Sequence, residues 1–228
     1  MKLHVCTTCV HFDEKPIEKL KDSCTYLGLN FSSYGVGDKW LGYIYNKSRD
    51  LAEYLKKIDS KYILFSDGFD SWMLQDEKTI IKKFEAMKTP IVIGSSFTPH
   101  IDYPGIDYSY LENKAFKYVN PGQFIGEKEA IIKALKILVE KAEGETCDNA
   151  MWDYAYQSGW FDFKVDHDCE LFLAMCVVPI DKIYFKDRRI YNSITKTYPA
   201  GIHFNGPRGE HPNGINFERM YKLYLENR

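Results

Sequence analysis

Two aspartates, Asp67 and Asp70, have the residue type and spacing that most directly suggest chemistry in this sequence. They follow the run 61–66, whose apolar and aromatic composition is typical of a buried β-strand. Ligands bind at the end of such a strand in open α/β sheets. Carboxylates placed there suit a Mg²⁺ or Mn²⁺ ion that shares its shell with the oxygens of a diphosphate. The alternative is a turn in which the aspartates bond nearby backbone N–H groups, and the motif alone leaves both interpretations open.

Four further polar clusters follow along the chain, and each has a purely structural alternative. Residues 120–126 include two glycines that allow close backbone approach to a ligand, but Asn-Pro-Gly is also an ordinary turn. Asp148 heads an expected helix, where it can carry chemistry or simply cap the helix. Asp166 and Asp168 flank a histidine in what composition alone favours as a polar turn. His203 can complete a metal shell as a neutral imidazole, or it can be bonded within the core.

Strand and helix patterns alternate around these clusters, which predicts an α/β fold. Strands are expected at 3–6, 61–66, 91–94 and 116–119, with short β-like pieces near 170–172, 183–185 and 202–204. Helices are expected at 17–24, 46–58, 80–87, 131–139, 148–157 and 217–225. Residues 95–114, rich in Pro, Asp and Tyr, are expected to form a long surface excursion, as an ordered wall or a lid.

Length and composition bound the class of protein. The 228 residues contain no linker or repeat, which predicts a single domain over residues 1–228. The formal charge of −2 provides no overall positive field for nucleic acid, although a local basic patch stays open. The six cysteines are expected to be thiols, and the pair Cys6 and Cys9 lacks partners for a zinc site. No secretory or bilayer-spanning segment is evident, so we expect a cytoplasmic protein without membrane contact.

The order of the clusters resembles the glycosyltransferase domain of procollagen lysyl hydroxylases and their relatives. In that family the corresponding pieces read D-S-Y-D, N/G-S-G-G-F-I-G, D-D-Q, L-D-H and H-G-N-G-P. Here they read D-G-F-D at 67–70, N-P-G-Q-F-I-G at 120–126, C-D-N at 147–149, D-H-D-C at 166–169 and H-F-N-G-P at 203–207. The resemblance extends from the strand at Leu3 to Pro207. It implies a GT-A fold, in which a Rossmann-like mixed sheet flanked by helices binds a nucleotide-sugar.

The resemblance also implies roles for individual residues. The implied ligands of Mn²⁺, with Mg²⁺ as the alternative ion, are Asp67, Asp70 and His203. Phe69 corresponds to an aromatic beside the uracil ring, and Asp148 to a carboxylate of the catalytic pocket. The other implied contacts to the nucleotide, the sugar pocket and phosphate are Thr7, Trp40, Lys47, Asn120, Gly122 and Arg208.

The sequence departs from the family pattern at several points. Pro121 and Gln123 replace Ser and Gly, and Phe204 replaces the Gly after the histidine. The cluster 147–149 has lost one carboxylate and the Gln, and the family's pocket tryptophan is missing near 97–100. We expect these changes to lie around the donor-sugar and acceptor site, and the metal ligands to be intact.

The sequence therefore predicts a metal-dependent glycosyltransferase that moves a sugar from a nucleotide-sugar, with UDP as the expected nucleotide, to a hydroxyl acceptor such as hydroxylysine of a collagen-like protein. Asp148 is the first candidate to orient or deprotonate that hydroxyl, and Asp166 and Asp168 come next, one of which can instead cap a strand end. A version without export signals fits a viral, phage or bacterial enzyme. The alternatives are transfer to another glycan or to a hydroxymethylated base of phage or viral DNA, a non-catalytic nucleotide-sugar or glycan-binding module, and a metal-dependent phosphohydrolase or nuclease.

Overall fold

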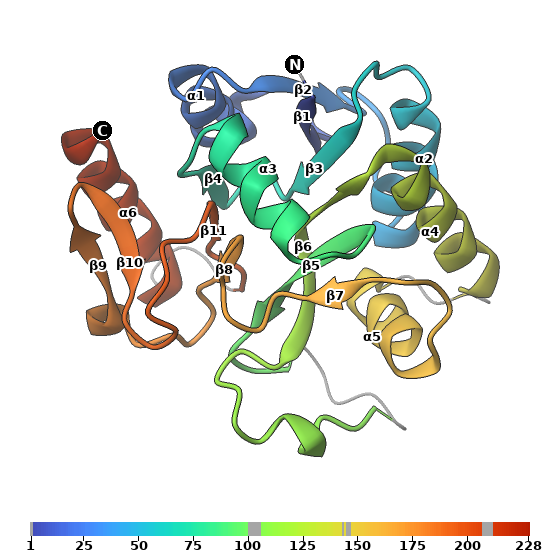
Figure 1. Ribbon diagram of the computed structural model, residues 1–228. Coiled ribbons are helices and arrows are strands. Elements are labelled where there is room, and N and C mark those ends of the chain that lie inside the picture. Colours follow the sequence, from blue (N-terminus) through green and yellow to red (C-terminus); the bar gives the residue numbers. More distant parts are fainter. Residues whose placement is uncertain (1, 100–105, 143, 145–146, 207–211) are drawn as a thin grey trace.

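The centre of the protein is a six-stranded mixed sheet with the strand order β2-β1-β3-β6-β5-β7 (Figure 1). A computed structural model describes residues 2–99, 106–142, 144, 147–206 and 212–228. β1 pairs in parallel with β2 and β3, whereas β6 runs antiparallel to both β3 and β5. The strands are β1 (Leu3–Thr8), β2 (Asn30–Tyr34), β3 (Tyr62–Ser66), β5 (Ile91–Ser96), β6 (Tyr118–Glu127) and β7 (Lys164–Val165).

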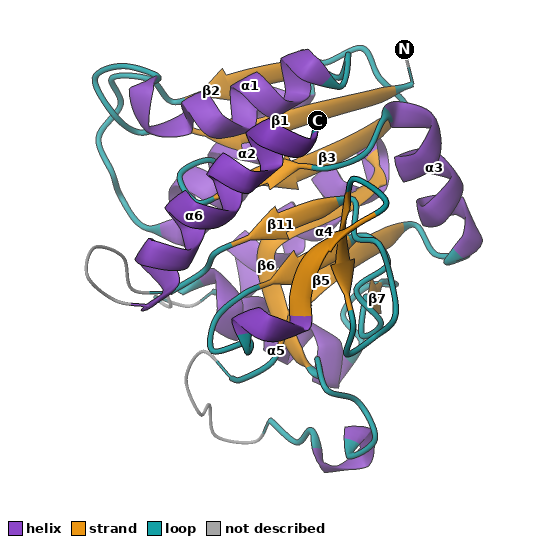
Figure 2. Ribbon diagram, turned by 90° about the vertical axis from the view of Figure 1, so that its left-hand side faces the viewer, coloured by secondary structure: helices purple, strands orange, loops and turns teal. Residues whose placement is uncertain are grey.

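Helices cover both faces of this sheet, which confirms the predicted α/β class (Figures 1 and 2). Successive residues of a strand point to opposite faces, and β3 shows the consequence. Leu64 belongs to a core shared with α1 and α3, while Phe65 belongs to one shared with α2, α4 and α5. The helices are α1 (Glu18–Tyr26), α2 (Asp50–Leu55), α3 (Glu77–Ala86), α4 (Lys128–Lys141) and α5 (Asp148–Ser158). Among the described residues, no helix is long and apolar enough to cross a membrane.

A third group of elements packs beside the main sheet around Trp72. This indole stacks on Phe204 with ring centroids 5.4 Å apart and meets Tyr221 edge-on at 5.1 Å. Three of its strands form a small sheet with the order β4-β11-β8, in which His203 of β11 lies opposite Ser71 of β4. The group consists of β4 (Ser71–Met73), β8 (Phe172–Ala174), β9 (Ile183–Lys186), β10 (Arg189–Asn192), β11 (Gly201–His203) and α6 (Pro212–Asn227).

The largest difference from the predicted elements concerns residues 120–126. We expected a strand at 116–119 with a turn after it. Instead, a single strand, β6, contains the whole motif 120–126. Its register against β5 jumps from Ile93 opposite Phe124 to Gly94 opposite Asn120, so the residues between them bulge out of the ladder. A bulge tolerates proline, which has no N–H to donate. The sequence pattern also missed β2 and β4, and the helix expected at 46–58 begins with a π-helical turn, Ile44–Arg49.

Part of the surface excursion is fastened to α5 by a buried hydrogen bond. The Tyr108 hydroxyl donates to the Asp153 carboxylate, and both side chains are buried. The excursion was expected to be either an ordered wall or a lid. Its residues 100–105 lie outside the described part of the chain, so the structure bears on that choice only through the rest of the excursion. Within the described residues 106–114, Tyr108 is thus anchored to α5.

Asp153 should make stability depend on pH. Burial raises the pKa of Asp153 to about 7, and the bond from Tyr108 only partly offsets this. The folded protein therefore holds a proton that the unfolded chain has lost from about pH 4 upward, and the free energy of unfolding falls as the pH rises to about 7. Asp153→Asn removes this dependence, so urea unfolding should show a smaller stability loss between about pH 5 and pH 8 than in wild type. Parallel losses in the two proteins would contradict this account.

Candidate functional site

The two aspartates of the first motif lie where the main sheet meets the small sheet. Asp67 follows β3, and its N–H donates to the Gly122 carbonyl at 2.7 Å. Asp70 precedes β4, and its carbonyl accepts the N–H of Phe204 at 2.8 Å. These backbone bonds bring the motif, the bulge of β6 and the end of β11 to one place, which is the sheet edge predicted from the sequence.

His203 faces both aspartates. Its Nε2 is 3.4 Å from Asp70 Oδ1 and 3.7 Å from Asp67 Oδ2. On the other side of the ring, Nδ1 is 3.3 Å from Asn120 Oδ1, which also accepts the N–H of Gly122 at 3.1 Å. The Gly122 bond fixes the amide orientation, so His203 Nδ1 is the donor and Nε2 is directed at the carboxylates. A metal-binding histidine is held in this way, with its outer nitrogen bonded to an oxygen acceptor.

The two carboxylates favour a positive charge at His203. Burial lowers the pKa of His203, but Asp70 and then Asp67 outweigh burial, so the net pKa is above its usual value. The same surroundings act on Asp67, whose pKa is raised because burial exceeds the opposing effects of Lys47 and His203. A cation placed between these side chains would relieve the desolvation of the carboxylate.

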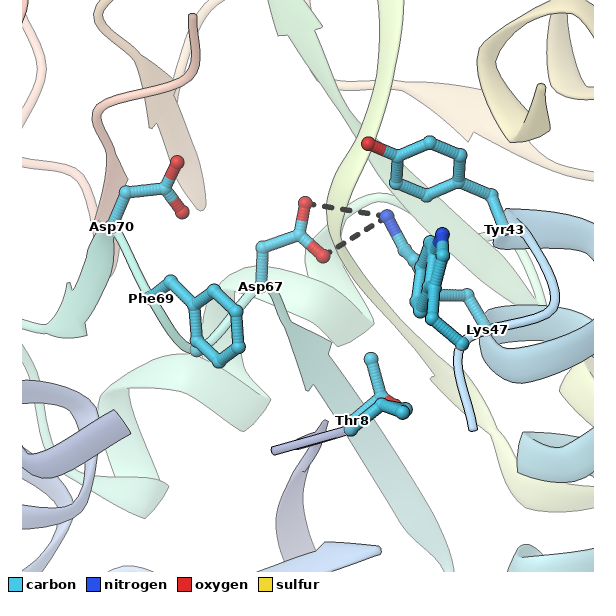
Figure 3. A pocket seen from close by; sticks show the side chains of 9 residues that line it. Thr8, Tyr43, Lys47, Asp67, Phe69 and Asp70 are labelled. Atoms are coloured by element: carbon cyan, nitrogen blue, oxygen red, sulfur yellow. Dashed lines mark hydrogen bonds and ion pairs between the residues drawn. The ribbon is translucent and has the colours of Figure 1, made fainter. Parts of the chain in front are cut away.

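A buried ammonium group connects the aspartate motif with α5. Lys47 Nζ lies 2.9 Å from Asp67 Oδ1 and 2.7 Å from Asp148 Oδ2, and the Lys47 side chain is only 6% exposed. Figure 3 shows the contact between Lys47 and Asp67. Burial lowers the pKa of Lys47, yet Asp148 and Asp67 together raise it well above its usual value. Lys47 is therefore charged and neutralises part of the negative charge at the sheet edge.

The donor set fits a divalent ion that arrives with phosphate. Within the described part of the chain, no three or more His, Cys, Asp and Glu side chains form a metal site on their own. The Asp67 carboxylate is turned toward Lys47, and Asp70 lies on its other side (Figure 3). Two carboxylates and an imidazole nevertheless suit Mn²⁺ or Mg²⁺, and an ion held on a diphosphate needs only a few protein ligands.

Two cavities meet at this point, and their linings differ. A cavity of about 390 Å³ has aromatic walls, with the Trp40 and Tyr43 rings 5.0 Å apart. Figure 3 shows Phe69 across the cavity from Tyr43. A second cavity of about 520 Å³ is lined mainly by polar groups, among them Asn120 and Asp148. Both cavities share Tyr43, Lys47, Asp67 and Asp70. The aspartate motif thus forms the boundary between an aromatic chamber, which suits a planar base, and a polar chamber, which suits sugar hydroxyls.

The structure brings together most of the residues selected from the sequence. The selected residues that line one or both chambers are Trp40, Lys47, Asp67, Phe69, Asp70, Asn120, Gly122, Asp148 and His203. Thr7 does not line either chamber, because its side chain lies beneath Gly68, where an added Cβ would come within 2.7 Å of Thr7 Oγ1. Its neighbour Thr8 points into the aromatic chamber instead. Arg208 lies outside the described residues.

Asp166 and Asp168 line neither chamber, so the structure does not bring these two catalytic candidates to the site. The buried Asp166 carboxylate accepts three backbone N–H groups, at 3.0, 2.7 and 2.9 Å, from Glu170, Leu171 and Phe172. It therefore has the alternative role, holding the turn that leads into β8. Asp168 is exposed and pairs with Lys114 at 2.7 Å.

The reassignment of Asp166 leads to a prediction about stability. Asp166→Ala leaves three backbone N–H groups without their acceptor, two of them buried and that of Glu170 partly buried, at about 1–3 kcal/mol for each buried unsatisfied group. The free energy of unfolding should drop by several kcal/mol, measured by urea denaturation. The rate of the sugar transfer expected from the sequence, per folded molecule, should stay within a few-fold of wild type. A loss of turnover that exceeds the loss of folded protein would restore Asp166 as a catalytic candidate.

Several residues of the site were missed by the sequence pattern. Tyr43 precedes Lys47 by four residues, a spacing that places both on one helical face. Asn149 and Asn205 border the polar chamber within motifs that were recognised, but no role had been given to them. Thr8 was missed because its neighbour Thr7 was selected instead. Adjacent residues of a strand point to opposite faces of the sheet, so an error of one residue selects the wrong face.

The departures from the family pattern do not all lie at the site, contrary to expectation. Gln123 is buried, and its Nε2 donates to Ser66 Oγ at 2.9 Å. Phe204 packs in the third core against Trp72. Neither residue lines a chamber, and nor does Pro121. These substitutions therefore change the packing behind the site and not the surface that meets substrate.

Gly122 is the position where the site should tolerate a side chain least. A Cβ added there would be 2.0 Å from His203 Cε1 and 2.4 Å from its Nδ1. Gly122→Ala must therefore displace the imidazole, and the sugar transfer expected from the sequence should fall at least tenfold, about 1.4 kcal/mol in the transition-state free energy. Gly28→Ala is the matched control, since its added methyl group meets nothing within 4 Å and only its positive φ is strained. Equal activities of the two variants would contradict the geometry.

Comparison with known proteins identifies the family. The family model described as the PLOD GT domain matches residues 2–218. The uncharacterized protein R699 of Acanthamoeba polyphaga mimivirus is 28% identical over 209 residues, which are 81% of this chain and 42% of that protein. Procollagen-lysine,2-oxoglutarate 5-dioxygenase 1 is 23% identical in Bos taurus and 25% in Rattus norvegicus, with 83% of this chain and 28% of each relative covered. The chain thus spans less than half the length of these relatives.

The fold has a counterpart among solved structures. A glycosyltransferase involved in the glycosylation of the major capsid of PBCV-1 superposes with a TM-score of 0.58, over 96% of this chain and 98% of that one, at 14% sequence identity. This likeness supports the GT-A fold that the motif order implied. Because the family model covers nearly the whole chain, the protein belongs to the PLOD GT domain family and is a glycosyltransferase.

Proposed function

We propose that this glycosyltransferase moves a sugar from a UDP-sugar to a hydroxyl group, with Mn²⁺, or Mg²⁺ in its place, bound at the aspartate motif. The observation that carries the proposal is the position of Asp67 and Asp70 on the boundary between the two chambers. A nucleotide-sugar has the same order of parts, with a flat base, a charged diphosphate and a polyhydroxylated sugar. If the base occupies the aromatic chamber and the sugar occupies the polar chamber, the diphosphate lies beside both carboxylates.

The residues of the boundary would support departure of the nucleoside diphosphate. A divalent ion held by Asp67, Asp70 and His203 would act as a Lewis acid on the leaving group. Lys47 adds a second positive charge in a buried setting, where charge is effective because water is excluded. The divalent ion and the Lys47 ammonium group would thus both lie where negative charge develops on the leaving diphosphate during transfer.

Asp148 is placed to orient the acceptor. Its Oδ1 accepts the N–H of Asn149 at 3.0 Å, and its Oδ2 contacts Lys47 at 2.7 Å. Both contacts hold the carboxylate at the head of α5, on the wall of the polar chamber. From there Asp148 can accept a hydrogen bond from the incoming hydroxyl and receive its proton.

The charge of the polar chamber favours a cationic or neutral acceptor. Asp67, Asp70 and Asp148 contribute three carboxylates, against the ammonium group of Lys47 and the imidazole of His203, and a divalent ion would arrive together with a diphosphate that offsets its charge. Hydroxylysine in a collagen-like protein carries an amine beside its hydroxyl and fits this balance. A hydroxymethylated base within DNA would bring phosphates toward the carboxylates, and like charges repel. We therefore place hydroxylysine first, with a neutral glycan next.

A panel of nucleotide-sugars tests the proposal. Hydrolysis of each donor, and transfer to a hydroxylysine peptide, would be measured with Mn²⁺ and with a chelator in its place. We expect turnover of a UDP-sugar that requires the ion. Failure to bind any nucleotide-sugar in the presence of Mn²⁺ would overturn the proposal and favour a fold that has lost its donor site.

A further inference from the structure

Two of the six cysteines lie on the wall of the polar chamber. Cys147 and Cys176 both line it, and both side chains are partly accessible. The remaining thiols are buried in the protein and line neither chamber; they are Cys6, Cys9, Cys24 and Cys169. The chain therefore separates its thiols into a pair at the site and a set enclosed by the core.

The fold positions the pair from two distant parts of the chain. Cys147 directly precedes α5 and is the neighbour of Asp148. Cys176 follows β8, and its N–H donates to Asn205 Oδ1 at 3.0 Å. The pairing of β8 with β11 places Cys176 beside the segment that carries His203. Each thiol is thus tied to a residue that lines the same chamber.

Burial also affects the acidity of three of the enclosed thiols. Thiolate, not thiol, is the reactive form of cysteine. Burial raises the pKa of Cys24 to about 12 and raises the pKa values of Cys6 and Cys169 further above the usual range. These thiols remain protonated at neutral pH and are shielded from reagents.

We propose that Cys147 and Cys176 form a thiol modification site at which soft electrophiles of the α,β-unsaturated carbonyl class add covalently and block sugar transfer. In each addition the sulfur forms a bond to the β-carbon, the carbon–carbon double bond becomes single, and the thiol proton ends on the α-carbon. No oxidant or leaving group is required. The adduct occupies volume in a chamber of about 520 Å³ next to Asp148. The blocking of transfer rests on the proposed function, whereas the selective addition does not.

Labelling of the purified full chain tests the selectivity. N-Ethylmaleimide would be added at neutral pH, and the adducts would be counted by intact mass and located by peptide mapping. We expect two rapid additions in wild type, one in Cys147→Ser or Cys176→Ser, and none in the double variant, with the other thiols labelled only after unfolding. Rapid addition at Cys6, Cys9, Cys24 or Cys169, or no addition at the pair, would overturn the inference.

Transfer assays test the consequence. The relevant quantity is the ratio of turnover after treatment to turnover before it, measured separately for each protein. We expect treatment to lower turnover at least tenfold in wild type, whereas the ratio should stay near one in the double serine variant. Wild type that carries both adducts and keeps its turnover would overturn the blocking step, with the proposed function intact. If untreated wild type turns over no donor, the proposed function fails, and the mass measurements still decide whether the thiol site exists.

Discussion

Asp70→Asn should lower the rate of sugar transfer by roughly two orders of magnitude or more, the usual effect of removing one preorganised group that stabilises developing charge. Asparagine keeps the shape of the side chain and the backbone bond from Phe204 to the residue 70 carbonyl, which is 2.8 Å long. It removes the charge that faces His203 Nε2 at 3.4 Å. The comparison of kcat at saturating donor and Mn²⁺ with that of wild type measures the effect.

Asp59→Asn is the matched control for this substitution. Asp59 is exposed and precedes β3, so it lies at the opposite end of the strand that leads to Asp67. Its neutralisation should leave kcat within a few-fold of wild type. A similar loss in both variants would point to a general effect of net charge, and an unchanged kcat in Asp70→Asn would remove Asp70 from the proposed metal site.

Lys47→Met should destabilise the protein strongly and also slow transfer. The methionine side chain fills similar space, but Asp67 and Asp148 lose the ammonium group that contacts them at 2.9 and 2.7 Å. Removal of one partner from a buried ion pair lowers stability by about 3–5 kcal/mol. Urea unfolding gives this value, and donor hydrolysis reports the accompanying loss of leaving-group stabilisation.

The effect of Lys47→Met should shrink at low pH. Burial already raises the pKa of Asp67, and Lys47 opposes that rise, so loss of the lysine raises the pKa of this carboxyl further. At about pH 5 more of the carboxyl is protonated in the folded variant, and the uncompensated charge is smaller than at about pH 8. Lys47→Met combined with Asp148→Asn should recover part of the stability, which a double-mutant cycle measures. Additive effects and a loss independent of pH would contradict the ion-pair account.

The sequence predicted the α/β class and the place of the aspartate motif because both depend on local patterns. An apolar run followed by Asp67 indicates a strand and its end. The order of motifs supplied His203, which lies far from Asp67 in sequence and reaches it only through the pairing of β11 with β4. Composition alone contains no information on that pairing, since short strands of three residues have little pattern of their own.

The errors arose where tertiary contacts decide the outcome. Asp166 follows β7 and Asp148 begins α5, so both are acidic residues beside an element boundary, but one accepts buried backbone N–H groups and the other pairs with Lys47. The partners come from distant parts of the chain. Likewise, Gln123 and Phe204 differ from the family at positions near the site in sequence, while their side chains turn into the core. Direction of a side chain follows from register and packing, which a linear motif does not contain.

Binding of Mn²⁺ in the presence of UDP tests the central claim most directly, namely that Asp67, Asp70 and His203 hold a divalent ion on the diphosphate of the donor. The electron paramagnetic resonance signal of free aqueous Mn²⁺ would be followed while protein is titrated into Mn²⁺ with and without UDP. The account predicts that UDP greatly increases Mn²⁺ binding in wild type, seen as loss of the free signal, up to one ion for each chain. Asp70→Asn should abolish this UDP-dependent increase in binding. Equal loss of signal in wild type and Asp70→Asn, or no influence of UDP, would contradict it.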